Sequence, residues 1–410
     1  MDQPTPLTPV DDFLPYGRQV IDDDDIAAVT AVLRGDWLTT GPAIERFEDA
    51  FRHATGAVYA IACANGTAAL HLAALAHGLG PGDQVLVPAV TFLATANAVR
   101  YVGADVVFAD VDPQTGLMTA ASVAAAIAAT DRPVKAIMPV HLTGHTVGLS
   151  TLAEALQGRL LIEDACHALG SEYADGDGTM VPVGSCPYGG VTMFSSHPVK
   201  TIATGEGGML TTNDGALAQR LRQLRNHGIV RDAAHFRNQA LAFDSDSGSV
   251  NPWYYEMHAL GFNYRQSDIH AALGASQMAK LPSFIARRRA LHAHYCARLA
   301  DAGPHIQIQP TAPASHPAWH LAVALIDFAA LGISRATVMT ALRERGIGSQ
   351  VHYQPVPWQP YYQQRYGPAD FPGASAYFGQ ILSLPLYPSM TEADVDRVVD
   401  GLLAVTDQQR

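Results

Sequence analysis

Lysine and net positive charge are both scarce in this chain of 410 residues. Only three lysines occur, Lys135, Lys200 and Lys280, among 26 basic residues, and 38 acidic residues bring the formal net charge to -12. This balance argues against an extended surface for the phosphates of DNA or RNA, so we expect no nucleic-acid partner. Any chemistry that depends on a lysine has only three candidates.

Cysteines and long apolar runs are also few, which excludes further classes of protein. The four cysteines lie far apart without a Cys-x-x-Cys pair, so neither a zinc ribbon nor a disulfide framework is expected. The most apolar stretch, residues 85–111, is interrupted by polar residues and is too short for a membrane span. Residues 1–15 lack the basic and apolar regions of a signal peptide. We therefore expect a cytoplasmic protein without a membrane partner.

The first half of the chain has the pattern of a parallel α/β sheet. Hydrophobic residues make up 48% of the chain, and between residues 58 and 212 short apolar runs alternate with Ala-rich helical segments. Seven strands are predicted, at 58–63, 84–88, 105–109, 134–140, 160–163, 191–195 and 208–212. Ligands of such sheets bind at the carboxyl ends of the strands, so the chemistry is expected just after these runs.

A second, smaller α/β domain is expected towards the C-terminus. An Asp-, Ser- and Gly-rich stretch at 243–252 predicts a loop, and a helix at 267–301 is expected to carry the chain out of the first domain. Further elements are predicted as a strand at 320–327 and helices at 336–345 and 391–406. The expected division is an N-terminal arm at 1–15, a large domain at 16–283 and a small domain at 284–410.

Two groups of possible metal ligands favour structural interpretations. The acidic run 22–25 is interpreted as the first turn of a helix at 23–33, where carboxylates complement the positive end of the helix dipole. His141 and His145 are four residues apart, but Gly144 lies between them and no glutamate follows His141. No metal site is expected.

Lys200 is the best candidate for covalent chemistry. Lys135 opens an apolar strand, and Lys280 lies on the long predicted helix, where a solvated side chain is expected. Lys200 instead follows the strand 191–195 and precedes the glycine-rich 204–208, so it stands on a loop at the sheet's carboxyl edge. A lysine that forms a Schiff base must be held at a fixed point and must lose its proton readily. A structural lysine is the alternative.

Two other segments could complete a site for pyridoxal phosphate. Asp164 ends a predicted strand, with His167 three residues later, and such an aspartate can keep a pyridine nitrogen protonated. Alternatively, Asp164 caps the following turn. The Asn65-Gly66-Thr67 segment joins a strand to an Ala-rich helix, whose free amides and dipole suit a phosphate. The three segments together predict an aldehyde anchor, a nitrogen partner and a phosphate seat.

A series of segments along nearly the whole chain resembles the sugar-nucleotide aminotransferases of the DegT/StrS family. The matching segments are Tyr16-Gly17-Arg18-Gln19, Trp37-Leu38-Thr39-Thr40-Gly41-Pro42, Asn65-Gly66-Thr67, Glu163-Asp164-Ala165-Cys166-His167, Lys200-Thr201-Ile202-Ala203-Thr204-Gly205-Glu206-Gly207-Gly208, Gly261-Phe262-Asn263-Tyr264-Arg265, Val351-His352-Tyr353 and Ser383-Leu384-Pro385-Leu386. The resemblance implies a pyridoxal-phosphate enzyme of aspartate-aminotransferase fold (fold type I). A large domain with a seven-stranded, mostly parallel sheet and a smaller C-terminal α/β domain would follow.

The resemblance also implies roles for individual residues. Lys200 would bind the cofactor's aldehyde and move protons, Asp164 would pair with the pyridine nitrogen, and His167 would lie beside the phenolic oxygen. The other cofactor-binding residues that it implies are Gly66, Thr67, Phe92, Ser195 and, from a partner subunit, Asn263. A homodimer with shared active sites would follow. Asn65 departs from the family pattern, because many relatives have serine there.

Within the family, the segments 197–200, 251–256 and 350–356 resemble a branch that aminates a UDP-linked sugar on the route to pseudaminic acid. The implied substrate is UDP-2-acetamido-2,6-dideoxy-β-L-arabino-hexos-4-ulose, with L-glutamate as amino donor and Trp37, Tyr254 and His352 as substrate-binding residues. GDP- or dTDP-linked 4-keto sugars are alternatives. So are a non-catalytic binding relative and a general amino-acid aminotransferase, although the sequence identifies no arginine for a substrate carboxylate.

Overall fold

A seven-stranded sheet forms the centre of the molecule in the computed structural model, which describes residues 12–407. The strands in spatial order are β1 (Tyr59–Cys63), β9 (Gly208–Thr212), β8 (Val191–Ser195), β5 (Leu160–Asp164), β4 (Val134–Ile137), β2 (Gln84–Pro88) and β3 (Asp105–Ala109). Only β9 runs antiparallel to its neighbours. All seven predicted strands are therefore in one mostly parallel sheet, and fold type I is confirmed.

The β4 strand is shorter than expected and ends at Ile137 rather than at residue 140. Pro139 follows, and a proline has no N–H with which to continue a ladder. Its carbonyl still accepts the amide of Asp164, and Val140 forms an isolated parallel bridge to Asp164. The chain therefore stays beside β5 although the regular strand has ended.

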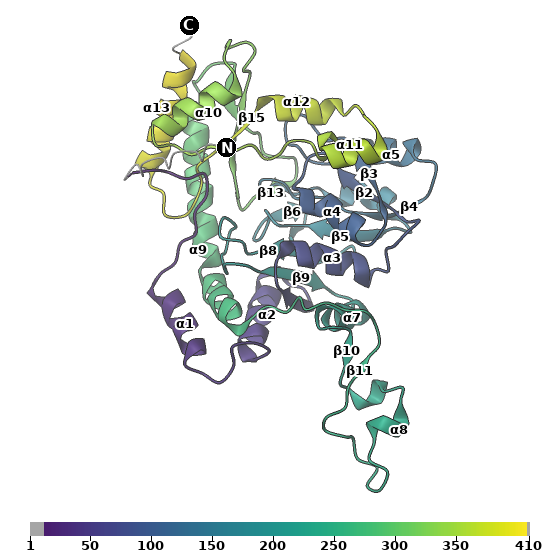
Figure 1. Cartoon of the computed structure of the whole chain (residues 1–410). Helices are drawn as coiled ribbons and strands as arrows, with labels where there is room; N and C mark the ends of the chain where they lie inside the picture. Colours follow the sequence, from purple (N-terminus) through teal and green to yellow (C-terminus); the bar gives the residue numbers. More distant parts are fainter. Residues whose placement is uncertain (1–11, 408–410) are drawn as a thin grey trace, which may run out of the picture.

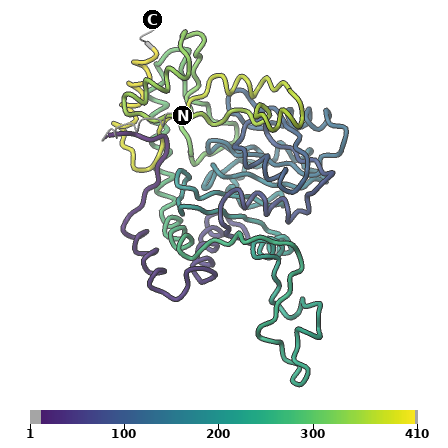
Figure 2. Tube along the Cα trace, viewed as in Figure 1, coloured from purple at the N-terminus to yellow at the C-terminus, as the bar shows by residue number. Residues whose placement is uncertain are grey.

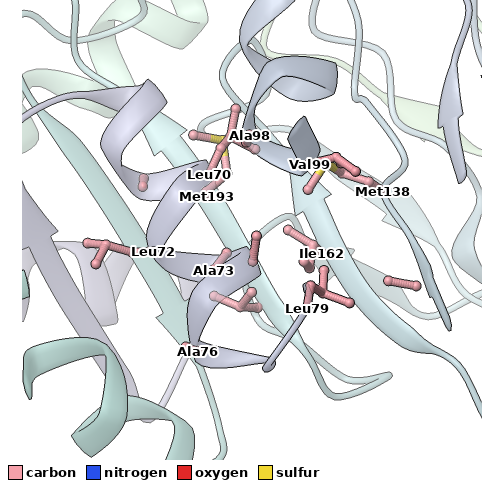
Figure 3. Close-up of a cluster of buried hydrophobic side chains, with 14 of the residues drawn as sticks. Leu70, Leu72, Ala73, Ala76, Leu79, Ala98, Val99, Met138, Ile162 and Met193 are labelled. Atoms are coloured by element: carbon pink, nitrogen blue, oxygen red, sulfur yellow. The ribbon is translucent and has the colours of Figure 1, made fainter. Parts of the chain in front are cut away.

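Helices cover both faces of the sheet, and the strands are therefore buried on both sides. The helices of the large sheet region are α2 (Pro42–Thr55), α3 (Gly66–Ala76), α4 (Leu93–Tyr101), α5 (Ala120–Ala129), α6 (Ala153–Leu156) and α7 (Gly215–Arg225). Figure 3 shows one face, where Leu70 and Ala73 of α3 and Val99 of α4 lie over Ile162 and Met193 of the sheet. On the other face, Phe51 of α2 packs against Phe194 of β8. These contacts fix the strand ends that carry the predicted site.

The long helix α9 (Asp268–Leu299) links the sheet to the C-terminal region (Figure 1). Its first part packs against α2 and α1 (Asp23–Leu33), and its later part packs against α13 (Glu392–Asp407). The helix passes through Pro282 without a break, so it crosses the expected domain boundary at 283.

The acidic run at the start of α1 has the structural role expected of it, but Lys280 is not solvated as predicted. Asp22 is the N-cap of α1 and forms a capping box with Asp25. The side chain of Lys280 is only 18% exposed, and its Nζ pairs with Asp22 and lies 2.9 Å from Asp25 Oδ2. The expectation for Lys280 was wrong because α1 packs on the turn of α9 that carries this lysine.

The C-terminal region contains a three-stranded antiparallel sheet and four helices besides α9. The sheet consists of β12 (Ile306–Ile308), β14 (Ala322–Ile326) and β15 (Ile381–Leu384), and the helices are α10 (Arg335–Glu344), α11 (Pro360–Tyr366), α12 (Pro372–Gln380) and α13. Both α11 and α12 lie over the β3 edge of the large sheet (Figure 1). Tyr366 OH accepts the amide of Val106 at 2.9 Å there. The amide of Val356 donates to the carbonyl of Ala89, directly after β2, at 2.8 Å, and this contact holds the chain near residue 350 at the carboxyl edge of the large sheet.

Residues 229–258 form an arm that projects from the body of the molecule (Figures 1 and 2). The arm contains β10 (Ile229–Val230), α8 (Gln239–Ala242) and β11 (Glu256–Met257), and the predicted loop 243–252 forms its tip region. A separate small sheet consists of β13 (Ser315–His316), β6 (Glu172–Ala174) and β7 (Met180–Pro182), and the 3-10 helices are η1 (Leu149–Leu152), η2 (Ala233–His235) and η3 (Val356–Trp358). Within residues 12–407, no helix has both the length and the apolar character that crossing a membrane requires.

Candidate active site

A cavity of about 980 Å³ lies at the carboxyl ends of β5 and β8, beside the N-terminal ends of α3 and α4. Eight of the predicted site residues line it, namely Gly66, Thr67, Phe92, Asp164, His167, Ser195, Lys200 and His352. They come from five separate parts of the chain, which the sheet topology brings to one edge. This is the edge at which the parallel-sheet pattern placed the chemistry.

Lys200 lies on the β8–β9 loop, which is tied together by its own hydrogen bonds. Ser196 Oγ lies 2.6 Å from Thr204 Oγ1, and the amide of Lys200 donates to the carbonyl of His197 at 2.8 Å. A Cβ atom on Gly207 would lie 2.2 Å from Ser196 Oγ, so only glycine fits against this closure. The lysine is therefore held at a fixed position on the cavity wall.

The surroundings of Lys200 make its amine easier to deprotonate than that of an exposed lysine. Burial lowers its pKa because the charged form loses hydration, and the nearby Cys166 and Asp164 oppose this shift only in part. A lysine must be deprotonated to act as a nucleophile or a base. Lys135 and Lys280 line no part of this cavity and are both paired with carboxylates.

Asp164 is held at the end of β5 by two donors, and its side chain is almost fully buried. Its Oδ2 accepts a hydrogen bond of 2.7 Å from Thr95 Oγ1, and its Oδ1 accepts the amide of Cys166 at 3.1 Å. The second bond is the turn cap that the sequence left open as an alternative. Because Asp164 also lines the cavity, the cap and a cofactor contact are compatible. Sequence reasoning missed Thr95, which lies in the first turn of α4.

The N-terminal end of α3 forms an open cradle of amides. Asn65 is the N-cap, and its Oδ1 accepts the amide of Ala68 at 2.8 Å. The amides of Gly66 and Thr67 precede the first intrahelical bond and have no acceptor within residues 12–407. A Cβ on Gly66 would lie 2.9 Å from Ser195 Cβ, so glycine keeps the cradle open. Asparagine at position 65 therefore caps the helix and leaves two amides for an anion.

His167 is a buried, neutral hydrogen-bonding group. Its Nδ1 accepts the amide of Thr143 at 3.3 Å, which places the ring proton on Nε2, 3.2 Å from Tyr353 OH. Burial lowers the pKa of His167 well below its usual value, and the charge of Lys200 adds to the shift. Since the imidazole stays neutral, it can donate from Nε2 without adding charge to the cavity.

His352 and Tyr353 close the cavity from the C-terminal region. His352 Nδ1 lies 2.8 Å from Ser383 Oγ, and burial lowers the pKa of His352 to about 3. Tyr353 packs its ring 5.8 Å from that of Phe92, and burial raises its pKa well above the usual value. Tyr353 was missed as a site residue, although it directly follows His352 in a segment that carries the family resemblance.

Three predicted site residues lie outside this cavity. Trp37 is 58% exposed between α1 and α2, and Tyr254 packs against Phe236 in the projecting arm. Asn263 is exposed and forms an isolated bridge with Asn226 after α7. No arginine is among the described residues that line the cavity, and Lys200 is the one lysine among them.

The family of the protein follows from comparison with known proteins. The model of the DegT/DnrJ/EryC1/StrS aminotransferase family matches residues 19–403. The chain belongs to this family. As a DegT/DnrJ/EryC1/StrS family member it is an aminotransferase that depends on pyridoxal phosphate, and the predicted family, enzyme class and cofactor are confirmed.

Solved structures of similar proteins support this assignment. Helicobacter pylori PseC, an aminotransferase involved in the biosynthesis of pseudoaminic acid, is 25% identical with a TM-score of 0.85, covering 97% of this chain and 100% of PseC. S. venezuelae DesV, solved in complex with a ketimine intermediate, is 31% identical with a TM-score of 0.79, covering 93% and 94%. Spr1654 of Streptococcus pneumoniae, a protein assigned as a sugar aminotransferase, is 26% identical in its PLP form with a TM-score of 0.83, covering 97% of this chain and 100% of Spr1654.

The residues of this family member fit its cofactor. The unpaired amides at the start of α3 and the space that Gly66 leaves beside Ser195 suit a phosphate group. Asp164 is an anionic acceptor for a protonated ring nitrogen, and Lys200 is an amine with a lowered pKa in the same cavity.

Proposed function

We propose that this aminotransferase transfers the amino group of L-glutamate to the 4-keto carbon of a nucleotide-linked 4-keto-6-deoxy sugar. The observation that carries the proposal is the cavity in which Lys200, Asp164 and the α3 amides meet. The similarity to PseC supports UDP-2-acetamido-2,6-dideoxy-β-L-arabino-hexos-4-ulose as the keto sugar, and hence a role in pseudaminic acid biosynthesis. GDP- and dTDP-linked 4-keto sugars are the alternative acceptors.

The proposed roles of the residues follow from their positions. When bound, pyridoxal phosphate supplies an electron sink for the carbon that loses a proton. Lys200 Nζ would anchor the aldehyde, and as a free amine it would take a proton from one carbon and return it to another. Asp164 would hold the ring nitrogen in its protonated form. His167 would donate from Nε2 towards the phenolic oxygen, and His352 would contact the sugar from the C-terminal side of the cavity.

The remaining cofactor contacts concern the phosphate and the ring faces. The amides of Gly66 and Thr67 and the hydroxyl of Ser195 would bind the phosphate, because the dipole of α3 favours an anion there. Phe92 is 55% exposed at the cavity and would stack on the ring. An aromatic ring stacked on the cofactor would also keep water from that face of the ring.

We also propose a homodimer with shared active sites. The partner subunit's Asn263 would reach the phosphate, and the partner subunit's Trp37 and Tyr254 would contact the substrate. The support is that these three side chains lie outside the cavity of their own chain. A cytoplasmic location and the division into a large domain at 16–283 and a small domain at 284–410 are parts of the same proposal.

Reduction with borohydride tests the covalent role of Lys200. Holoenzyme treated with borohydride and digested should give one modified peptide in mass spectrometry, with the cofactor on Lys200. Lys200→Ala should lose both the adduct and all turnover, whereas Lys135→Ala, at the start of β4 and outside the cavity, should keep both. An adduct on Lys135 or Lys280, or no adduct, would overturn the assignment.

The acceptor is tested by incubating the enzyme with glutamate and UDP-, dTDP- and GDP-linked 4-keto-6-deoxy sugars. Amination of the UDP-linked N-acetyl sugar with the highest kcat/KM is the expected result. A preference for a dTDP- or GDP-linked sugar would replace the specific substrate and keep the reaction class. Conversion of glutamate without amination of any sugar would contradict the proposed function.

A further inference from the structure

Arg288, in the second half of α9, is a buried cation without an ion-pair partner among residues 12–407. It is 1% exposed, and all three of its hydrogen-bond acceptors there are backbone carbonyls. The Nη1 atom donates to the carbonyls of Trp319, His320 and Leu386 at 3.4, 3.2 and 2.9 Å. Because a buried charge costs free energy when it has no counter-ion, an apolar side chain of similar volume would serve a purely structural role at least as well.

Two of these carbonyls belong to peptide groups whose opposite edges bind Thr143. The amides of His320 and Leu321 donate to the Thr143 carbonyl at 2.9 and 3.2 Å. Both peptide groups are trans, so the C=O and N–H of each point in opposite directions, and both groups lie between Arg288 and Thr143. A carbonyl that accepts from a cation makes the amide of its own peptide group a stronger donor. Arg288 therefore strengthens the hydrogen bonds that hold Thr143.

Thr143 depends on tertiary contacts to keep its backbone conformation. Its φ is 64°, in the left-handed region that β-branched residues rarely adopt, and the residue is fully buried. A Cβ on the adjacent Gly144 would lie 3.0 Å from the amide nitrogen of His320, so the turn packs directly on the peptide groups that Arg288 binds. Ser171 adds a second tie, because its Oγ donates to the Gly144 carbonyl at 2.8 Å and accepts the amide of Ala318 at 2.9 Å.

The turn at Thr143 sets the tautomer of His167. The Thr143 amide donates to His167 Nδ1 at 3.3 Å, so the ring proton is on Nε2, 3.2 Å from Tyr353 OH. The ring of His320 lies 4.3 Å from that of His167, measured between centroids, and limits its rotation. If the Thr143 amide turned away, Nδ1 could take the proton. Nε2 would then be an acceptor and could not donate to an oxygen in the cavity.

We propose that Arg288 is a positioning residue, which acts through Thr143 to keep His167 in the tautomer that donates from Nε2. Arg288 itself does not line the cavity. Ser171 supports the same turn as a second positioning residue. This inference rests on the proposed function in one respect, because the tautomer matters for the reaction only if His167 donates to the phenolic oxygen of the cofactor.

Nitrogen NMR of the holoenzyme with isotope-labelled histidine reports the tautomer. The signals that disappear in His167→Gln belong to His167. In the wild type they should show Nε2–H alone, whereas Arg288→Met and Ser171→Ala should each give a mixture of the two tautomers. Both variants should also raise the Kd of pyridoxal phosphate for the apoenzyme about fivefold, because one neutral hydrogen bond contributes on that order.

Two variants of α9 serve as controls. Arg288→Lys keeps the cation and three donors, so it should preserve the Nε2–H tautomer and the affinity for the cofactor. Arg287 also donates to a carbonyl, that of Met390 at 3.1 Å, but it binds none of the peptide groups that hold Thr143. Arg287→Met should therefore give the wild-type NMR signals and Kd.

Arg288→Gln is a further test variant in case Arg288→Met does not fold, because its amide can still donate to a carbonyl but carries no charge. Pure Nε2–H signals in whichever of these two variants folds would overturn the proposal. Loss of folding in both would give Arg288 a structural role and would also overturn it. A mixture of tautomers with an unchanged Kd would support the positioning role and contradict the proposed contact of His167 with the cofactor, so the two failures are distinguishable.

Discussion

Thr95 Oγ1 donates a hydrogen bond of 2.7 Å to Asp164 Oδ2, and Thr91 Oγ1 lies 2.7 Å from Thr95 Oγ1. All three residues are less than 5% exposed. A carboxylate can only accept, so Thr95 donates to Asp164 and Thr91 donates to Thr95. Two hydroxyls at the start of α4 thereby orient the carboxylate proposed to pair with the cofactor's ring nitrogen.

Thr95→Val should weaken cofactor binding about tenfold, because a hydrogen bond to a charged group contributes on the order of 1.5–3 kcal/mol. Valine keeps the shape of the side chain and removes the donor. The readout is the Kd of pyridoxal phosphate from fluorescence titration of the apoenzyme. Thr95→Ser restores the hydroxyl and should restore the affinity. Equal affinities of wild type and Thr95→Val would show that this hydrogen bond does not position the carboxylate for the cofactor.

Local sequence patterns could predict the strands but not most of their tertiary partners. Residues 84–88 and 191–195 are short, apolar and bounded by turn residues, and they form β2 and β8 with the expected ends. Lys200 could be selected because there were only two other lysines. The Thr95–Asp164 bond joins residues 69 positions apart, and it depends on how α4 packs on the sheet. No local pattern carries that information.

The absence of tertiary contacts from local sequence patterns also explains the wrong prediction for Lys280 and the untested predictions for Trp37 and Tyr254. Lys280 was expected to be solvated because a helix pattern shows which face is polar but not which other helix covers it. Its partner Asp25 is on α1, far away in the sequence. Trp37 and Tyr254 matched the family pattern, but a sequence does not show whether a residue reaches its own cavity or that of a second subunit. Their substrate contacts therefore stay predictions.

His292→Phe should make the protein more resistant to acid. His292 stacks on Trp319 with ring centroids 3.6 Å apart and planes inclined by 4°, and burial, with His145 nearby, lowers its pKa to about 3. The unfolded chain binds a proton at this histidine below about pH 6.5, so the folded state loses stability as pH falls from about 6.5 towards 3. Phenylalanine keeps the stack and cannot be protonated.

The measurement is the melting temperature of both proteins at pH 5 and at pH 8. The stability of His292→Phe relative to the wild type should be greater at pH 5 than at pH 8. The expected difference in the free energy of unfolding is on the order of 1.4 kcal/mol for each pH unit below 6.5. His53→Phe is the control, because His53 is exposed on α2 and its replacement changes no buried group. The same difference from wild type at both pH values would contradict the prediction for His292.

Lys280→Met should destabilise the fold by about 3 kcal/mol, because it leaves a buried carboxylate without its cation. The side chain of Asp25 is fully buried and lies 2.9 Å from Lys280 Nζ. Lys135→Met is a matched control, since the Lys135–Asp83 pair at 2.8 Å is 41% and 23% exposed and should contribute less than about 1 kcal/mol. Denaturant unfolding of both variants gives the comparison. Equal losses would show that burial does not distinguish the two pairs.

The pH dependence of the Lys280 contribution has a definite direction. Desolvation lowers the pKa of Lys280, but the carboxylates of Asp22 and Asp25 raise it by more, so the net shift of the pKa is upward. A raised pKa means that the contribution is fully present below the unfolded value of about 10.4 and is lost as pH rises through the folded value. The stability gap between wild type and Lys280→Met should therefore narrow only at strongly alkaline pH.

Glu256→Gln should loosen the projecting arm while leaving the body of the molecule unchanged. The Glu256 carboxylate accepts the amides of Arg237 and Asn238 at 2.8 and 2.7 Å and Tyr254 OH at 2.8 Å, and it pairs with His258. Desolvation opposes ionisation, but these donors prevail and lower the pKa of Glu256 to about 2. A glutamine offers one neutral acceptor oxygen, and its NH₂ group would face other donors. The hydrogen-bond network that holds Tyr254 in place is therefore weakened.

Hydrogen–deuterium exchange, measured peptide by peptide, detects this loosening of the arm. Peptides within 229–258 should exchange faster in Glu256→Gln, whereas peptides from β8 and α3 should not change. In the wild type, the stabilisation of the arm by Glu256 is expected to be fully present above about pH 4.3, the ordinary pKa of a glutamate. It should be lost as the pH falls through about 2, the pKa of Glu256 in the folded protein. Glu344→Gln on α10 serves as the control for a surface charge change. Unchanged exchange in the arm of Glu256→Gln would show that its backbone pairing and aromatic contacts hold it without the carboxylate.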